Sequence, residues 1–154
     1  MSNKKSILEL KRKNKIAVLC KLWMNNNIQI SINDFLQVDE TLCIQNKILN
    51  KLHIMDNKNE SNVYIEKEID IISIFTDYII NNININKSYV FFVKDATKIG
   101  GLILGGDTII NKHEFIIKES EFFDKGCSIF FCTLHAESGV CLWRGEYDSR
   151  IYVW

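Results

Sequence analysis

Three cysteines and one histidine near the C-terminus are the residues whose types could bind a metal ion. They are Cys127, Cys132, His135 and Cys141, and thiolates and imidazoles are the preferred ligands of zinc. No Cys-x-x-Cys pair is present, however, and on one strand Cys127 and Cys132 would point to opposite faces. We therefore predict buried or half-buried free thiols, with no bound metal and no cofactor.

The remaining candidate chemistry does not form a catalytic pattern. His113 and His135 each have an acid nearby in the sequence, but neither lies beside a nucleophile motif such as Gly-x-Ser-x-Gly. The glycine-rich segment 100–106 lacks the Lys-Ser/Thr pair of a phosphate loop, and turn signals follow it where a helix should begin. We expect a tight hairpin there. The sequence thus predicts no catalytic residues and no enzyme.

Two stretches have the composition of a protein-binding surface. The first, residues 119–124, sets carboxylates beside aromatic rings, a mixture suited to a charged rim around an apolar anchor. The second, the last hairpin over 142–154, combines Trp, Tyr and Arg, which are enriched at binding hot spots. A polar turn and ordinary strand packing are the structural alternatives. The predicted partner-binding residues are Glu119, Glu121, Phe122, Asp124, Trp143, Glu146, Tyr147 and Asp148.

The distribution of glycine predicts how the chain is organised around these stretches. All seven glycines lie between Gly100 and Gly145, and the chain has no proline. The first 99 residues therefore lack both strong breakers of regular structure. Apolar spacing predicts a helix at 6–24, one helix or a pair of helices from about 31 to 54, and a helix at about 65–80, part of which could instead be a strand because it is rich in isoleucine. Asn25-Asn26-Asn27 should end the first helix, Ser31 to Asp34 has the form of a capping box, and 56–62 is expected to be a polar loop.

Strands are predicted after residue 85, where the apolar period changes. They are expected at 88–93, 99–104, 108–110, 114–118, 127–134, 140–144 and 151–154. The predicted fold is a single α+β domain over 1–154: about 1–85 is mainly helical, and about 86–154 is an antiparallel, meander-like sheet of six or seven strands. The N-terminal helices would pack on one face of this sheet.

Charge and cysteine usage limit the partners and the compartment. The 19 basic and 19 acidic residues cancel, which removes the usual electrostatic argument for a nucleic-acid or membrane-surface protein without excluding a local patch. The basic run 11–15 is followed by only five apolar residues, too few for a secretory signal. Together with an odd number of cysteines, five, this favours free thiols in a reducing, cytoplasmic setting with no membrane partner.

A DNA-binding regulator is the alternative function. Residues 23–54 have a loose helix-turn-helix cadence, and 62–65 could begin a wing. The second helix would offer only Gln45, Asn46, Lys47, Asn50 and Lys51 to DNA. Because this set is sparse, nucleic acid is not the expected partner.

In size, composition and layout, the whole chain resembles the immunity proteins of bacterial contact-dependent inhibition and related polymorphic toxin systems. The resemblance implies specific binding to one cognate toxin domain, commonly a nuclease, whose active site or substrate access is blocked. One feature departs from it, because inhibitors of basic nucleases are often acidic and this chain is neutral overall. Local acidity is available at 119–124 and 66–70.

Overall fold

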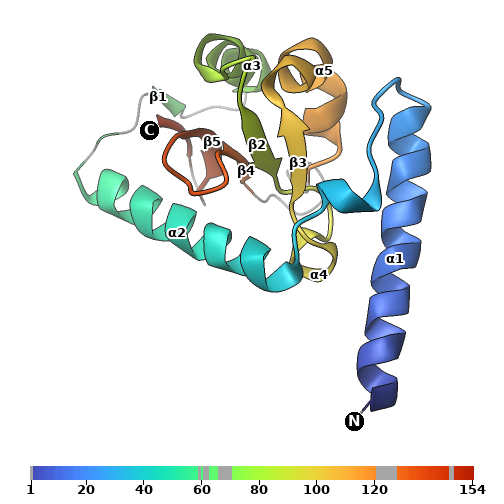
Figure 1. The fold of residues 1–154 in the computed structure, drawn as a ribbon. Coiled ribbons are helices and arrows are strands. Elements are labelled where there is room, and N and C mark those ends of the chain that lie inside the picture. The colour runs from blue at the N-terminus through green and yellow to red at the C-terminus, as the bar shows by residue number, and fades with distance from the viewer. Residues whose placement is uncertain (1, 59, 61–62, 66–70, 121–127, 146–147) are drawn as a thin grey trace.

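A computed structural model describes residues 2–58, 60, 63–65, 71–120, 128–145 and 148–154. These residues form five α-helices, a short 3-10 helix and six strands (Figure 1). In chain order the elements are α1 (Ser2–Met24), η1 (Ile32–Asp34), α2 (Val38–Asn57), β1 (Val63–Ile65), α3 (Ile71–Asn82), β2 (Ser88–Phe91), α4 (Ala96–Ile99), β3 (Leu102–Gly105), α5 (Gly106–Lys118), β4 (Ile129–Cys132), β5 (Gly139–Arg144) and β6 (Ser149–Val153).

The strands form one antiparallel sheet in the order β1-β6-β5-β4-β2-β3. The α+β class and the antiparallel pairing are confirmed. The strand count is wrong, because the described part of 86–154 holds five strands rather than six or seven. The remaining strand, β1, lies between the loop predicted at 56–62 and the helix predicted from about 65, and it pairs with β6. Only β4-β5-β6 is a meander, since β2 lies between β4 and β3.

Both faces of the sheet are covered by helices, whereas one covered face was expected. Alternate residues of each central strand point to opposite faces, so Phe131 packs with α3 and α5 while its neighbour Cys132 packs with α2. Figure 1 shows α2 along one side of the sheet and α3 and α5 on the other. The reason is that β4 is apolar at every position and fully buried, as strands enclosed on both faces are.

Helix α5 replaces the strands predicted at 108–110 and 114–118 and the hairpin predicted at Gly105-Gly106. A side chain at Gly106 would collide with the carbonyl of Asn84, so glycine permits the close approach with which α5 begins. Ile109, Ile116 and Ile117 then fall on one buried helical face. The short runs 108–110 and 114–118 resembled strands. The buried isoleucines, however, lie seven and eight positions after Ile109, which is the spacing of one helical face.

Helix α1 ends as predicted in the asparagine run. Asn27 adopts a left-handed conformation (φ 58°), and the amide of Ile28 donates to the carbonyl of Trp23 at 3.0 Å. The capping box of Ser31 and Asp34 is also present, but it begins the three-residue η1. Helix α2 begins later, where the Glu40 carboxylate accepts a hydrogen bond from the Gln37 amide at 3.0 Å.

Candidate partner-binding site

The last hairpin and helix α2 together build a pocket at the surface. Trp143 on β5 lies opposite Arg150 on β6 in the strand register, and Trp143 and Tyr152 pack on the side of the sheet that α2 covers. The pocket between them is about 250 Å³ and is lined by Leu49, Leu52, His53, Asp56, Trp143 and Tyr152. Apolar walls with a few polar groups are the usual composition of a binding pocket.

A chain of hydrogen bonds fixes the polar side of this pocket. The Tyr152 hydroxyl donates to Asp56 Oδ1 at 2.8 Å, and the Arg150 guanidinium bonds the same carboxylate oxygen. Arg150 Nε also donates to Asp148 Oδ2 at 2.8 Å. One guanidinium therefore links two carboxylates, one on α2 and one at the start of the hairpin's second strand.

The electrostatic environment keeps Tyr152 and Arg150 protonated at neutral pH. Burial, followed by the hydrogen bond to Asp56, raises the pKa of Tyr152 to about 12, so its hydroxyl stays a donor. The hydrogen bond to Asp148 is the largest cause that raises the pKa of Arg150 above its ordinary value. The result is a fixed network, not a group that exchanges protons near pH 7.

Two of the predicted partner-binding residues, Trp143 and Asp148, belong to this pocket and its network. Glu119 is half-buried at the C-terminus of α5, where its carbonyl accepts a hydrogen bond from the Lys94 amide at 3.2 Å. The other five predicted residues lie outside the described part of the chain: Glu121, Phe122, Asp124, Glu146 and Tyr147.

The strand register brings the described ends of both predicted stretches to the same end of the sheet. Ser120 forms a bridge with Val93, just past the end of β2. The Arg144 amide at the end of β5 donates to Ser128 Oγ at 3.1 Å, just before β4 begins. Because β2 and β5 both run antiparallel to β4, residues 93, 128 and 144 share one end of the sheet. Ser120 and Arg144, which are 24 positions apart in the sequence, thus lie at the same end of the sheet.

Sequence reasoning missed the contribution of α2 to the pocket. Asp56 was assigned to a loop, but α2 continues to Asn57 and places Asp56 one turn after Leu52. The buried stripe Thr41, Ile44, Ile48 and Leu52 could have extended the helix to that turn. His53, which also lines the pocket, has its Nε2 3.2 Å from the Asn57 side-chain amide.

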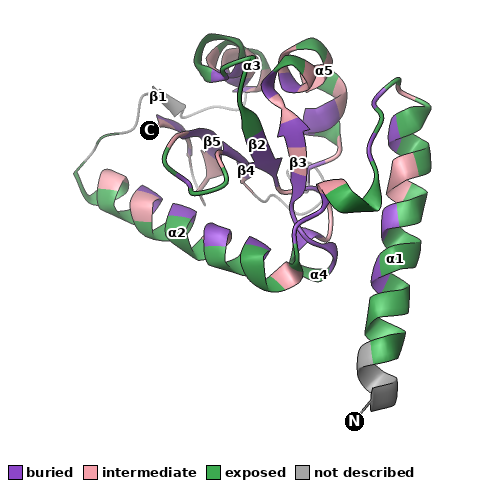
Figure 2. Ribbon diagram, in the orientation of Figure 1, coloured by how far each residue is buried: buried purple, intermediate pink, exposed green. Residues whose placement is uncertain are grey.

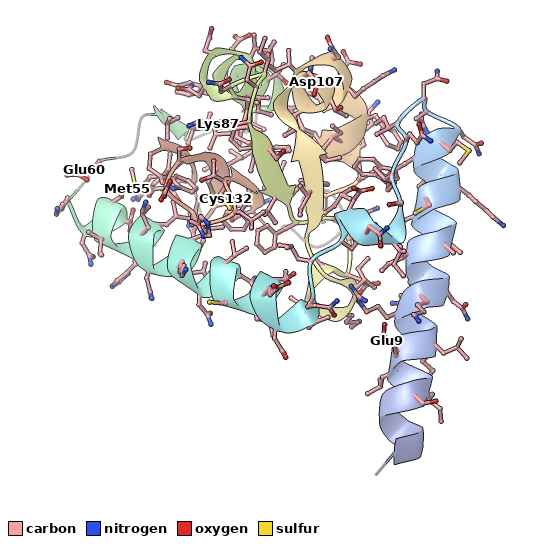
Figure 3. All side chains as sticks on the ribbon, in the orientation of Figure 1. Glu9, Met55, Glu60, Lys87, Asp107 and Cys132 are labelled. Atoms are coloured by element: carbon pink, nitrogen blue, oxygen red, sulfur yellow. The ribbon has the colours of Figure 1, made fainter. Side chains whose placement is uncertain are left out.

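The alternative metal site is not built by the residues that the structure describes. Burial raises the pKa of Cys132 to about 12 and that of Cys141 well above its ordinary value, which makes both thiols unreactive. Figure 3 shows Cys132 in the layer between α2 and the sheet, whereas His135 is exposed and Cys127 lies outside the described residues. Within the described ranges, no group of three or more His, Cys, Asp or Glu side chains could hold a metal ion.

Charges that cancel over the whole chain are unevenly distributed along the sequence. Helix α1 stands beside the rest of the molecule and its N-terminal half extends past it (Figure 1). Residues 1–24 carry seven Lys and Arg against one Glu, whereas residues 25–154 carry 12 Lys and Arg against 18 Asp and Glu. Among the described residues after α1, 10 Lys and Arg stand against 12 Asp and Glu, so most of this acid excess belongs to residues outside the described part of the chain.

Comparisons with known proteins give a family assignment. A family model described as YxiF protein matches residues 19–154, which excludes most of α1. No curated protein and no solved structure matches the chain significantly. Over the residues that the structure describes, no helix is both long and apolar enough to span a membrane.

Proposed function

We propose that this chain, which belongs to the YxiF family, is an immunity protein that binds and neutralises a cognate bacterial toxin domain. The toxin class that its charge suits best is a nuclease. Inhibition proceeds by protein–protein interaction, without turnover by this chain. The observation that carries the proposal is the acidic composition of residues 25–154, which follow α1 in the sequence.

Inhibitors of basic nucleases are often acidic, and the whole chain is neutral. Residues 25–154 taken alone, however, are acidic. Nucleases that bind phosphate backbones present basic surfaces, and an excess of six carboxylates over residues 25–154 complements such a surface. Complementary charge steers association and raises its rate, mainly at low salt.

The pocket between α2 and the last hairpin supplies the anchoring part of the interface. Trp143 is half-buried, Arg150 and Tyr152 hold Asp56 in place, and Asp148 lies at the rim. Hot spots at protein interfaces concentrate in such packed aromatic and charged clusters. Because the network is already formed in the free chain, little side-chain ordering is needed on binding.

DNA binding is the competing proposal, and the geometry gives it less support. Residues 25–37, which include η1, separate α1 from α2, whereas a helix-turn-helix uses a turn of about three or four residues. Helix α2 packs Ile44, Ile48 and Leu52 against the sheet, and β1 pairs with β6. The basic residues of α1 remain the part of the chain suited to phosphate contacts.

The test is protection from a toxin domain encoded beside this chain. Co-expression of the wild-type chain should restore growth, and the purified pair should bind more slowly as salt rises. Trp143→Ala should weaken binding by about 2 kcal/mol, as hot-spot truncations do. The matched control is Ile80→Ala. Ile80 is an exposed residue of α3, on the opposite face of the sheet, and this variant should still protect fully.

Two outcomes would contradict the proposal. Toxicity that persists with the wild-type chain removes the immunity function, and steeply salt-dependent DNA binding by the chain alone would favour the regulator.

A further inference from the structure

We propose that the pocket between α2 and the β5–β6 hairpin receives a single cationic side chain of the partner, an arginine in particular. This inference rests on the proposed function, because it names the chemistry of the partner at the same surface. It follows from the size of the pocket, the groups that line it and the charges of its network.

The size of the pocket suits one side chain. Its volume of about 250 Å³ lies below the range of about 300–1,000 Å³ that is usual for small-molecule sites. Leu49 and Leu52 on α2 form an apolar wall, which suits the methylene stem of a long side chain. A short polar ligand would leave this wall in contact with water.

The aromatic residues suit a flat cation. Trp143 is half-buried and lines the pocket together with Tyr152, and guanidinium groups stack on aromatic faces. The molecule uses a related contact nearby, where Lys51 Nζ lies 5.8 Å from the centroid of the Trp154 ring. Lys51 also donates to the Ala136 carbonyl at 3.0 Å, so its ammonium is held outside the pocket.

The charge of the network also favours a cation. Arg150 is shared by Asp56 and Asp148, so among the described side chains of this network two carboxylates face one guanidinium. Tyr152 keeps its proton at neutral pH and adds no charge. A carboxylate ligand would be repelled by Asp56, while an arginine would complete an alternating row of two acids and two bases.

The experiment uses the full chain and small probes, without the toxin. The indole Nε1–H signal of Trp143 is followed by NMR during titration with N-acetyl-arginine amide. We expect saturable shifts at millimolar probe, confined to Trp143 among the three indole signals. N-acetyl-citrulline amide has nearly the same shape without the charge and should bind about fivefold more weakly or not at all. N-acetyl-lysine amide should fall between the two, because an ammonium stacks less well than a guanidinium.

Two variants locate the site. Asp56→Asn keeps an acceptor for Tyr152 but removes the carboxylate charge. It should lower the affinity for the arginine probe by about threefold to fivefold. Asp39→Asn, an exposed acid in the first turn of the same helix, is the matched control and should leave binding unchanged.

Equal shifts with the citrulline probe, shifts at another indole, or equal effects of the two variants would overturn the inference. The outcome is separable from that for the proposed function. If the chain binds the arginine probe but protects against no toxin, the pocket proposal stands and the immunity function fails. If the chain protects but does not bind the probe, the immunity function stands and the pocket proposal fails.

Discussion

Helices α1 and α2 are the two longest helices of the molecule's described part, yet they are held by different forces. Helix α2 buries one residue on nearly every turn against the sheet: Thr41, Ile44, Ile48 and Leu52. Helix α1 packs only along its C-terminal half, through Ile16 and Trp23. Figure 2 shows a buried stripe along α2, whereas the described side chains at the start of α1, residues 6–11, are exposed.

Polar contacts replace the missing apolar stripe in the middle of α1. Arg12 is buried, and its guanidinium donates to the carbonyl oxygens of Ile99 at 2.9 Å and Leu36 at 3.1 Å. Beside it, Lys15 pairs with Asp95 at 2.9 Å. Beyond Arg12, towards the N-terminus, Ile7, Leu8 and Leu10 are each more than half exposed. Length alone therefore does not tell how a helix is held; the spacing of apolar residues and the satisfaction of buried polar groups do.

The largest effect is expected at the apolar stripe of α2. Ile48→Ala removes a side chain that is 1% exposed and should lower the free energy of unfolding by about 3 kcal/mol, through lost burial and a residual cavity. Leu42→Ala, exposed on the same helix, should lower it by less than about 1 kcal/mol. Urea denaturation measures both, and equal losses would show that α2 is not packed as described.

A smaller loss of stability is expected when the hydrogen bonds of Arg12 on α1 are removed. Arg12→Met keeps most of the stem but leaves the Leu36 and Ile99 carbonyls without this donor, which should cost about 2 kcal/mol. Lys13→Met, on the exposed side of the same turn, should change stability by less than about 0.5 kcal/mol. If Arg12→Met is as mild as Lys13→Met, apolar packing alone holds α1 and the contrast with α2 fails.

The ion pairs of Asp95 should stabilise the fold less than the hydrogen bonds of Arg12 do, and their contribution should depend on pH. Hydrogen bonds from Lys15 and then Lys98 lower the pKa of Asp95 to about 2, from an ordinary value of 3.8. A lowered pKa in the folded state stabilises the fold above about pH 4, and this contribution disappears as the pH falls from 4 to 2.

Asp95→Asn should accordingly lower stability at pH 7 by less than about 1 kcal/mol, as partly exposed pairs do. The difference between variant and wild type should vanish near pH 2. Thermal unfolding across pH measures it, and a difference that persists unchanged at pH 2 would exclude the ion pairs as its source.

The smallest effect is expected at the projecting end of α1. Leu8 is 66% exposed, so Leu8→Gln should leave the free energy of unfolding within about 0.5 kcal/mol of the wild type. A loss comparable to that of Arg12→Met would mean that this half of α1 packs against the body in solution.

Local sequence signals predicted the elements that depend on neighbours in the chain. The end of α1 at the asparagine run, the capping box at Ser31 and the β5–β6 hairpin are all present. Each depends on residues within a few positions of one another, where capping and turn chemistry act. The same reasoning named Trp143 and Asp148 as surface candidates, and both lie at the pocket.

Predictions that depended on distant partners succeeded less well. Gly105-Gly106 begins helix α5 instead of a hairpin turn, and glycine is needed there because Asn84 comes close to Gly106. The short isoleucine runs that follow did not distinguish a strand from a helix. Asp56 became part of a site only because Arg150 and Tyr152 lie across from it, more than ninety residues along the chain.

The sequence by itself determined an α+β domain with an antiparallel sheet, because the periods of apolar residues and the distribution of glycine are local properties. Only the tertiary structure decided that both faces of the sheet are covered, and that β1 joins it from the first half of the chain. It also decided that the basic helix α1 stands beside the rest of the molecule with its N-terminal half extending past it. The physical reason is that composition sums charge and hydrophobicity over the chain, whereas binding depends on where packing places them.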